Sequence, residues 1–126
     1  IHLKEKYSVF ENIYMLEPIY DQHLLDVIRS NCFLYIHSQS QCGTAPSLVE
    51  AMNLNLPVIC FDVPTNRETT ENKSIYFKDK SDLESLIVNL NHNSINQLKL
   101  SMFQIAKKRY NWNRIASLYK RIFDSL

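Results

Sequence analysis

Glycine is nearly absent from this chain, since Gly43 is the only one among its 126 residues. This scarcity excludes the glycine-rich G-x-G-x-x-G dinucleotide fingerprint and the Walker phosphate loop. No apolar run approaches the roughly 18 residues of a membrane span, and no signal-peptide pattern is visible. There is also no D-x-D carboxylate pair that would hold a divalent ion. We therefore expect a cytoplasmic protein with no bound metal or cofactor.

Neither the cysteines nor the net charge indicates a metal site, a reactive thiol or a nucleic-acid partner. The three cysteines lack metal-ligand spacing, and Cys32 and Cys60, which flank or lie in predicted strands, are expected to be inert reduced thiols. A net charge of +1 gives no reason to expect a nucleic-acid partner. The length and the hydrophobic content of 45% predict one globular domain over residues 1–126.

Two short apolar runs organise the chain. Phe33–Ile36 and Val58–Phe61 are typical of buried parallel strands, the first of them buried on both faces. Ser47–Asn53, between them, has the composition of a short helix. The pattern predicts a strand–helix–strand crossover, whose loop from His37 to Ala45 lies at the carboxyl edge where ligands bind.

The start of that helix has the features of an anion site. Pro46 suits the first turn, and Thr44 is expected to cap it, which leaves the amides of Ser47 and Leu48 pointing outward to a phosphate or pyrophosphate. Glu50, one turn later, can accept hydrogen bonds from a ribose diol. The alternative is that Ser47-x-x-Glu50 is only a capping box.

Three stretches carry a resemblance to a known family. They are Gly43-Thr44-Ala45-Pro46-Ser47-Leu48-Val49-Glu50-Ala51-Met52, Leu56-Pro57-Val58-Ile59 and Asp62-Val63-Pro64-Thr65-Asn66-Arg67-Glu68. Together they resemble the donor half of family 4 glycosyltransferases with the GT-B fold, especially the rhamnosyltransferase-like branch. Two positions depart from the pattern: Cys42 stands where many members have a first glutamate, and Gln39 replaces the motif's second histidine.

The resemblance implies a retaining, metal-independent transferase that uses a UDP-sugar or dTDP-sugar. The acceptor would be a glycan or a polyprenyl-linked lipid in bacterial surface polysaccharide (O-antigen, lipopolysaccharide) synthesis, at the inner face of the membrane. This chain would be the donor-binding half, which binds nucleotide weakly and transfers no sugar alone. The implied donor-binding residues are Gly43, Thr44, Pro46, Ser47, Leu48 and Glu50, with Ile19 and Tyr20 near the base and His37 as the one candidate catalytic residue.

The remaining pattern completes a Rossmann-like α/β domain, the truncated C-terminal half of a GT-B enzyme. Asn12–Leu16 and Ser74–Phe77 are predicted as further strands, which makes a parallel sheet of about four. Asp21, Thr65 and Ser81 are predicted to cap helices, and from about residue 94 two more helices are expected to pack on the domain. The inner face of the first of these two helices is predicted to consist of Ile95, Leu98, Met102, Ile105 and Ala106. The last has an apolar stripe and a basic face, which indicates either a solvated helix or a peripheral contact with anionic lipid.

Three alternatives remain open from the sequence. The first is a nucleotide-sugar 2-epimerase of the same fold, and the second is a non-catalytic nucleotide-binding module. A receiver-like signalling domain is the third, with Asp62 as its phosphoacceptor. Cys42 lies just before a predicted helix start, a setting in which nucleophilic cysteines occur, but no protease signature accompanies it, and we do not expect a cysteine hydrolase.

Overall fold

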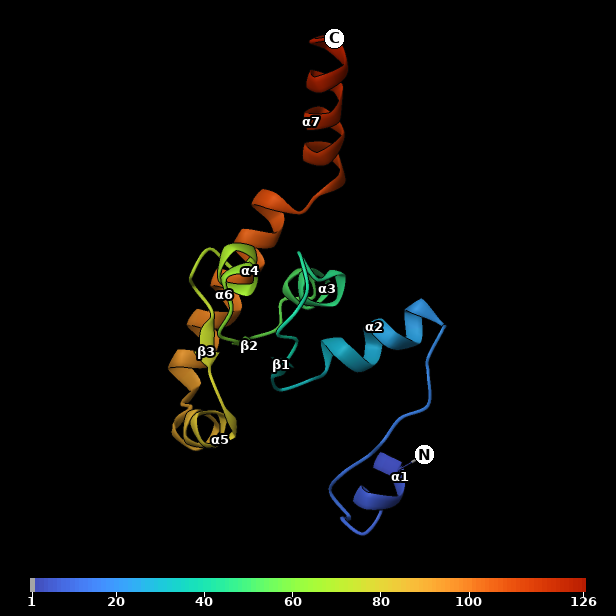
Figure 1. Ribbon diagram of the computed structural model, residues 1–126, viewed down its shortest axis with the longest axis vertical. Coiled ribbons are helices and arrows are strands. Elements are labelled where there is room, and N and C mark those ends of the chain that lie inside the picture. Colours follow the sequence, from blue (N-terminus) through green and yellow to red (C-terminus); the bar gives the residue numbers. More distant parts are fainter. Residues whose placement is uncertain (1) are drawn as a thin grey trace.

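The computed structural model describes residues 2–126, so the first residue of the expected domain lies outside it. The chain folds as α/β, with a small parallel sheet flanked by helices (Figure 1). The strands are β1 (Tyr35–His37), β2 (Val58–Phe61) and β3 (Ile75–Phe77), in the order β1-β2-β3. In this sheet Ile36 lies opposite Ile59, and Phe61 lies opposite Phe77. All three strands therefore end at the same edge.

Helices connect and extend the strands. They are α1 (His2–Tyr7), α2 (Gln22–Ser30), α3 (Pro46–Asn53), α4 (Pro64–Thr69), α5 (Lys80–Asn89), α6 (His92–Arg109) and α7 (Trp112–Asp124). The crossovers predicted from the sequence are present, with α3 between β1 and β2 and α4 between β2 and β3. No helix within residues 2–126 is long and apolar enough to cross a bilayer.

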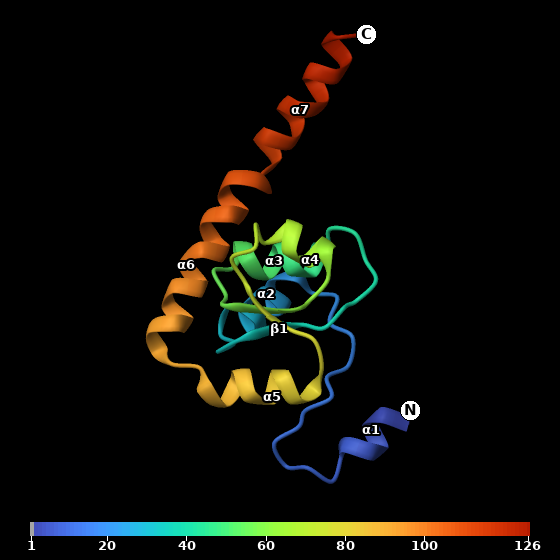
Figure 2. The same ribbon diagram turned by 60° about the vertical axis from the view of Figure 1, so that its left-hand side comes forward.

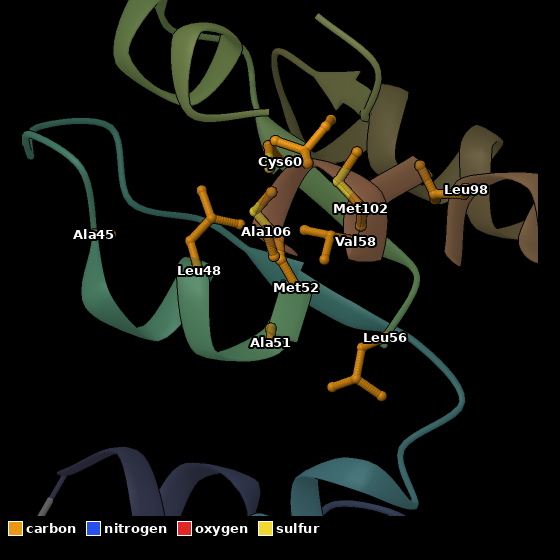
Figure 3. Close-up of a cluster of buried hydrophobic side chains, with 11 residues drawn as sticks. Ala45, Leu48, Ala51, Met52, Leu56, Val58, Cys60, Leu98, Met102 and Ala106 are labelled. Carbon is orange, nitrogen blue, oxygen red and sulfur yellow. The ribbon is translucent and has the colours of Figure 1, made fainter. Parts of the chain in front are cut away.

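The core forms where α3 and α6 meet over β2. Leu48 and Met52 of α3, Val58 of β2 and Met102 of α6 are all fully buried there. Figure 3 shows these side chains converging from the two helices and the strand. The five positions that the sequence predicts as the inner face of α6, namely Ile95, Leu98, Met102, Ile105 and Ala106, are all buried. The predicted inner face of α6 is therefore confirmed: its apolar residues recur with the helical period of 3.6, and they are the ones that pack into the core.

Two predictions about the sheet are wrong. Asn12–Leu16 is not a strand: it runs as irregular chain away from the sheet (Figure 1), so three strands rather than four are present in the described residues. A β-prone segment needs a hydrogen-bonding partner, and β1 pairs only with β2. Because β2 is its only partner, β1 is an edge strand. The prediction that this strand is buried on both faces is also wrong, since Ile36 is partly exposed.

Several helix starts also differ from the predictions. Asp21 does cap α2, where its carboxylate accepts the Leu24 amide at 3.0 Å. However, α5 is capped by Asp79 rather than Ser81, and α4 starts after Val63 with no side-chain cap. Where two polar residues lie close together, the one whose backbone is extended becomes the cap, and composition alone does not decide this.

The last helix does not pack on the domain as expected. None of the side chains of α7 is buried, and in Figures 1 and 2 the helix projects away from the end of α6.

The two cysteines that were expected to be inert differ in their surroundings. Cys32 is exposed, so burial does not shield its thiol as the expectation assumed. Cys60 is buried in β2 as predicted, and burial raises its pKa to about 11.

The scarcity of glycine has a visible consequence after α3. Asn55 adopts φ of 60°, in the left-handed region, and the amides of Asn55 and Leu56 bond the carbonyls of Met52 and Ala51 at 3.1 Å. This is the six-to-one and five-to-two pattern with which helices commonly end, and glycine is the usual residue at that position. Asparagine adopts this conformation more readily than other residues with a Cβ atom, because its short polar side chain can interact with the neighbouring backbone.

We expect stability to follow the order glycine, asparagine, alanine at position 55. Asn55→Gly should leave the free energy of unfolding unchanged or raise it, since it also removes a buried, unpartnered side-chain oxygen. Asn55→Ala should lower it by about 1 kcal/mol, because alanine keeps the Cβ penalty but lacks the short polar side chain that favours this conformation. Urea denaturation measures both, and an alanine variant as stable as the glycine variant would contradict the assignment.

The core predicts a sharp contrast between two leucines on α6. Leu98 is 5% exposed and Leu100 is 58% exposed, although they lie two residues apart. Leu98→Ala should cost about 2–5 kcal/mol of unfolding free energy because it opens a cavity. Leu100→Ala, the matched control, should change it by no more than about 0.5 kcal/mol. Equal losses in chemical denaturation would show that α6 does not pack through this face.

Candidate functional site

The candidate site lies at the carboxyl edge of the sheet, around the start of α3. The N-cap residue is Ala45, whose side chain offers no acceptor, and Pro46 is the first helical residue. The prediction that Thr44 caps this helix is therefore wrong. The capping-box alternative is not observed either, because no side chain bonds an amide of the first turn.

The amides of this first turn differ from one another. Leu48 donates its amide to the Ala45 carbonyl at 3.1 Å, so the expectation that it points outward is not met. Ser47, in contrast, finds no acceptor for its amide among residues 2–126. Ser47 is half-buried and Pro46 is exposed, so the turn is open to solvent. One unpaired amide at the positive end of α3 is thus available to an anion.

Gly43 precedes this turn in an unusual setting. A Cβ atom placed there would meet nothing within 4 Å in the described part of the chain, and its φ lies outside the left-handed region. Neither backbone conformation nor crowding within the protein therefore requires glycine here. The absence of a side chain at this position would also allow a ligand to approach the backbone closely.

Glu50 lies one turn further along α3, with a side chain that is 46% exposed. Its Oε2 accepts from Nη1 of Arg29, at the end of α2, at 2.5 Å. The carboxylate thus stays at the surface, held by one oxygen, while Oε1 has no partner within residues 2–126. Sequence reasoning missed Arg29, because nothing in the chain's local pattern indicates which cation meets Glu50.

A groove of about 440 Å³ opens beside these residues. Its volume is within the range of small-molecule sites. One wall is the outer face of α3 with the preceding loop, and the other is the junction between α6 and α7. The lining residues are Thr44, Pro46, Val49, Glu50, Asn53, Tyr110, Asn111, Trp112 and Ile115. Ile19 and Tyr20 do not line it: Tyr20 is almost fully exposed in the irregular segment before α2.

His37 ends β1, as predicted, but it is only 2% exposed and its ring stacks on Tyr35 with centroids 6.2 Å apart. Its Nε2 atom has no hydrogen-bond partner among the described residues. Burial lowers the pKa of His37 below its ordinary value of 6.5, because the charged form loses solvation. This environment favours a neutral imidazole within the fold.

Residues after β2 form structure rather than the site. Asn66 is buried and donates to the carbonyls of Gln39 and Phe61, at 3.1 and 3.0 Å, which ties the loop after β1 to the end of β2. Arg67 pairs with Asp62 through two hydrogen bonds of 2.5 and 3.0 Å and stacks over the Tyr76 ring. Hydrogen bonding to Arg67 lowers the pKa of Asp62. A carboxylate engaged in this way is poorly suited as a phosphoacceptor.

Comparison with known proteins yields no match to a family model, to a curated protein or to a solved structure.

The buried histidine predicts a pH dependence of stability. Because the folded pKa of His37 is lowered, its contribution to stability is complete above the unfolded value of 6.5 and is lost as pH falls. At low pH the unfolded chain binds a proton on His37 that the folded chain does not bind. The free energy of unfolding therefore falls with decreasing pH, by at most about 1.4 kcal/mol per pH unit. His37→Phe should flatten this slope in urea denaturation at a series of pH values.

His92→Phe, at the exposed start of α6, is the matched control and should keep the slope of the natural protein. If the two variants behave alike, His37 is not the source of the pH dependence.

Proposed function

We propose that this chain is the donor-binding part of a retaining, metal-independent glycosyltransferase that uses a UDP-sugar or dTDP-sugar. The fold would be the Rossmann-like second half of a GT-B enzyme. The acceptor would be a glycan or a polyprenyl-linked lipid at the inner face of the cytoplasmic membrane. Support comes from the parallel crossover, from the motif between Gly43 and Met52, and from the geometry of the start of α3.

The observation that carries the proposal is the set formed by Gly43, Ser47 and Glu50. The backbone at Gly43 has free space around it, and the Ser47 amide has no acceptor. Both features suit a diphosphate, since they allow close approach of its oxygens. Glu50 lines the groove with Thr44 and Pro46, whereas Gly43 and Ser47 do not line it. The Oε1 atom of Glu50 is free for the ribose hydroxyls. The backbone at Gly43 and Ser47 thus offers donors to an anion, and Glu50, one turn later, offers an acceptor to a diol. A nucleoside diphosphate has its diphosphate and its ribose diol in the same order.

This geometry changes one part of the expected site. Leu48 contributes packing, not an amide, because its N–H is used within the turn and its side chain is fully buried. His37 has no exposed surface with which to touch a sugar, so we assign it no catalytic step. In the proposed mechanism the start of α3 stabilises the negative charge that develops on the departing diphosphate.

The proposal predicts a separation of binding from stability. Gly43→Ala should leave the free energy of unfolding within about 0.5 kcal/mol, since its Cβ meets nothing in the protein. It should weaken UDP or dTDP binding by about ten-fold, because the added methyl group occupies the space of the diphosphate. Calorimetric titration measures the affinity, and urea denaturation measures the stability.

Glu50→Gln should also weaken nucleotide binding about ten-fold or more, as expected for a lost charge-assisted hydrogen bond. Glu84→Gln, on the exposed face of α5 beside Lys80, is the matched control and should bind as the natural protein does. A protein that binds none of UDP, dTDP and GDP would overturn the proposal. Consumption of a UDP-sugar without any acceptor would favour the epimerase alternative.

A further inference from the structure

The helix α7 has an apolar face that no part of the described chain covers. Apolar residues recur along one side at helical spacing; they are Trp112, Ile115, Ala116, Tyr119, Ile122, Phe123 and Leu126. Trp112 is 87% exposed, Phe123 is 69% exposed and Leu126 is 97% exposed. Figures 1 and 2 both show α7 extending outward from α6, free of the sheet and the other helices. An exposed stripe of this length indicates a contact surface.

The charges on α7 indicate what kind of surface it meets. Arg114, Lys120 and Arg121 occupy the other side of the helix, and Asp124 is its one acidic residue. At about 100° per residue, Lys120 lies next to one border of the apolar stripe, whereas Arg114 and Arg121 lie on the side opposite to it. Lys120 pairs with Asp124 at 3.3 Å, and both side chains are largely exposed, so this pair does little to reduce the positive charge.

This arrangement matches a helix that lies in a membrane surface. Such helices bury the apolar face at the boundary between headgroups and acyl chains, while the cations of the polar side stay at the level of the headgroups. Tryptophan and tyrosine, here Trp112 and Tyr119, suit the boundary because each joins an apolar ring to a polar atom. The end of α6 adds Lys107, Lys108 and Arg109 just before α7, although Lys108 and Arg109 contact Glu71 and Glu68.

We propose that α7 docks the protein on an anionic lipid surface, with Trp112, Ile122 and Phe123 inserted and the cations of the polar side, including Arg114 and Arg121, at the level of the headgroups. The inference is independent of the proposed function, since it rests only on the exposure, periodicity and charge of α7. It requires no membrane-spanning segment. The groove beside Glu50 lies next to the start of α7, because Trp112 and Ile115 belong to both. Docking through α7 would therefore hold that groove close to the bilayer.

The protein carries its own reporter for this contact. Trp112 is its only tryptophan and lies at the start of the stripe. Titration with vesicles of phosphatidylcholine and phosphatidylglycerol should shift Trp112 emission to the blue and make the protein sediment with the vesicles. Vesicles of phosphatidylcholine alone should bind it far more weakly. A high salt concentration should release it, since the contribution of the cations is screened.

Two pairs of variants separate the charged and apolar contributions. Arg114→Gln with Arg121→Gln should weaken binding by roughly thirty-fold, at about 1 kcal/mol per cation near the surface. Lys78→Gln with Lys80→Gln, just before and at the start of α5, removes equal charge elsewhere and should change binding little. Ile122→Ser should weaken vesicle binding, whereas Val88→Ser, on the exposed side of α5, should not. All these side chains are exposed, so circular dichroism should show an unchanged fold.

Three outcomes would overturn the proposal. The first is no blue shift and no sedimentation with anionic vesicles. The second is equal binding to both vesicle types, which would remove the role of the cations. The third is a blue shift without lipid that grows with protein concentration, together with a dimer in equilibrium sedimentation, which would make the stripe a contact between copies.

Discussion

The packing of α3 against α6 over β2 is the constraint on which the rest of this structure depends. The sheet has only three short strands, and a sheet of that size is not stable without a covered face. Met52 and Met102 fill the junction from the two helices, and unbranched thioether side chains adapt well to such a gap. This packing fixes α3 in place. The position of Gly43, Ser47 and Glu50 at the sheet edge follows from it.

A nearly glycine-free chain must end its helices by other means. Asn55 takes the left-handed position after α3, and Glu71 takes the equivalent position after α4, where the Asn72 amide bonds the Arg67 carbonyl at 2.8 Å. Glutamate is a costly choice there. Lys108 and Lys73 lie within 4 Å of the Glu71 carboxylate. Surrounding contacts therefore retain a conformation that local preference disfavours.

Sequence reasoning predicted the elements whose signal is local. The apolar runs predicted β2 and most of β1, and the periodic pattern predicted α6 with its buried face residue by residue. It failed where the outcome depends on contacts between distant parts of the chain. Asn12–Leu16 has strand composition but no partner, and α7 has a packing face but nothing to pack on. The pairing of Arg29 with Glu50, and the bridge that Asn66 makes to Gln39, join residues far apart in sequence.

The uncapped start of α3 connects stability to the proposed function. A side-chain cap at an N-terminus typically contributes about 1 kcal/mol, and α2, α5, α6 and α7 have one, whereas α3 and the short helix α4 do not. At α3, Ala45 occupies the position instead, although Thr44 is adjacent, so this contribution is absent. A capping oxygen would accept an amide of the first turn and place its own negative partial charge where an anion must bind. Departures from local rules that carry no compensating contact within the protein are expected where a ligand supplies it. The missing cap, which leaves the Ser47 amide unpaired, and the open space at Gly43 lie within five residues, and a diphosphate would account for both.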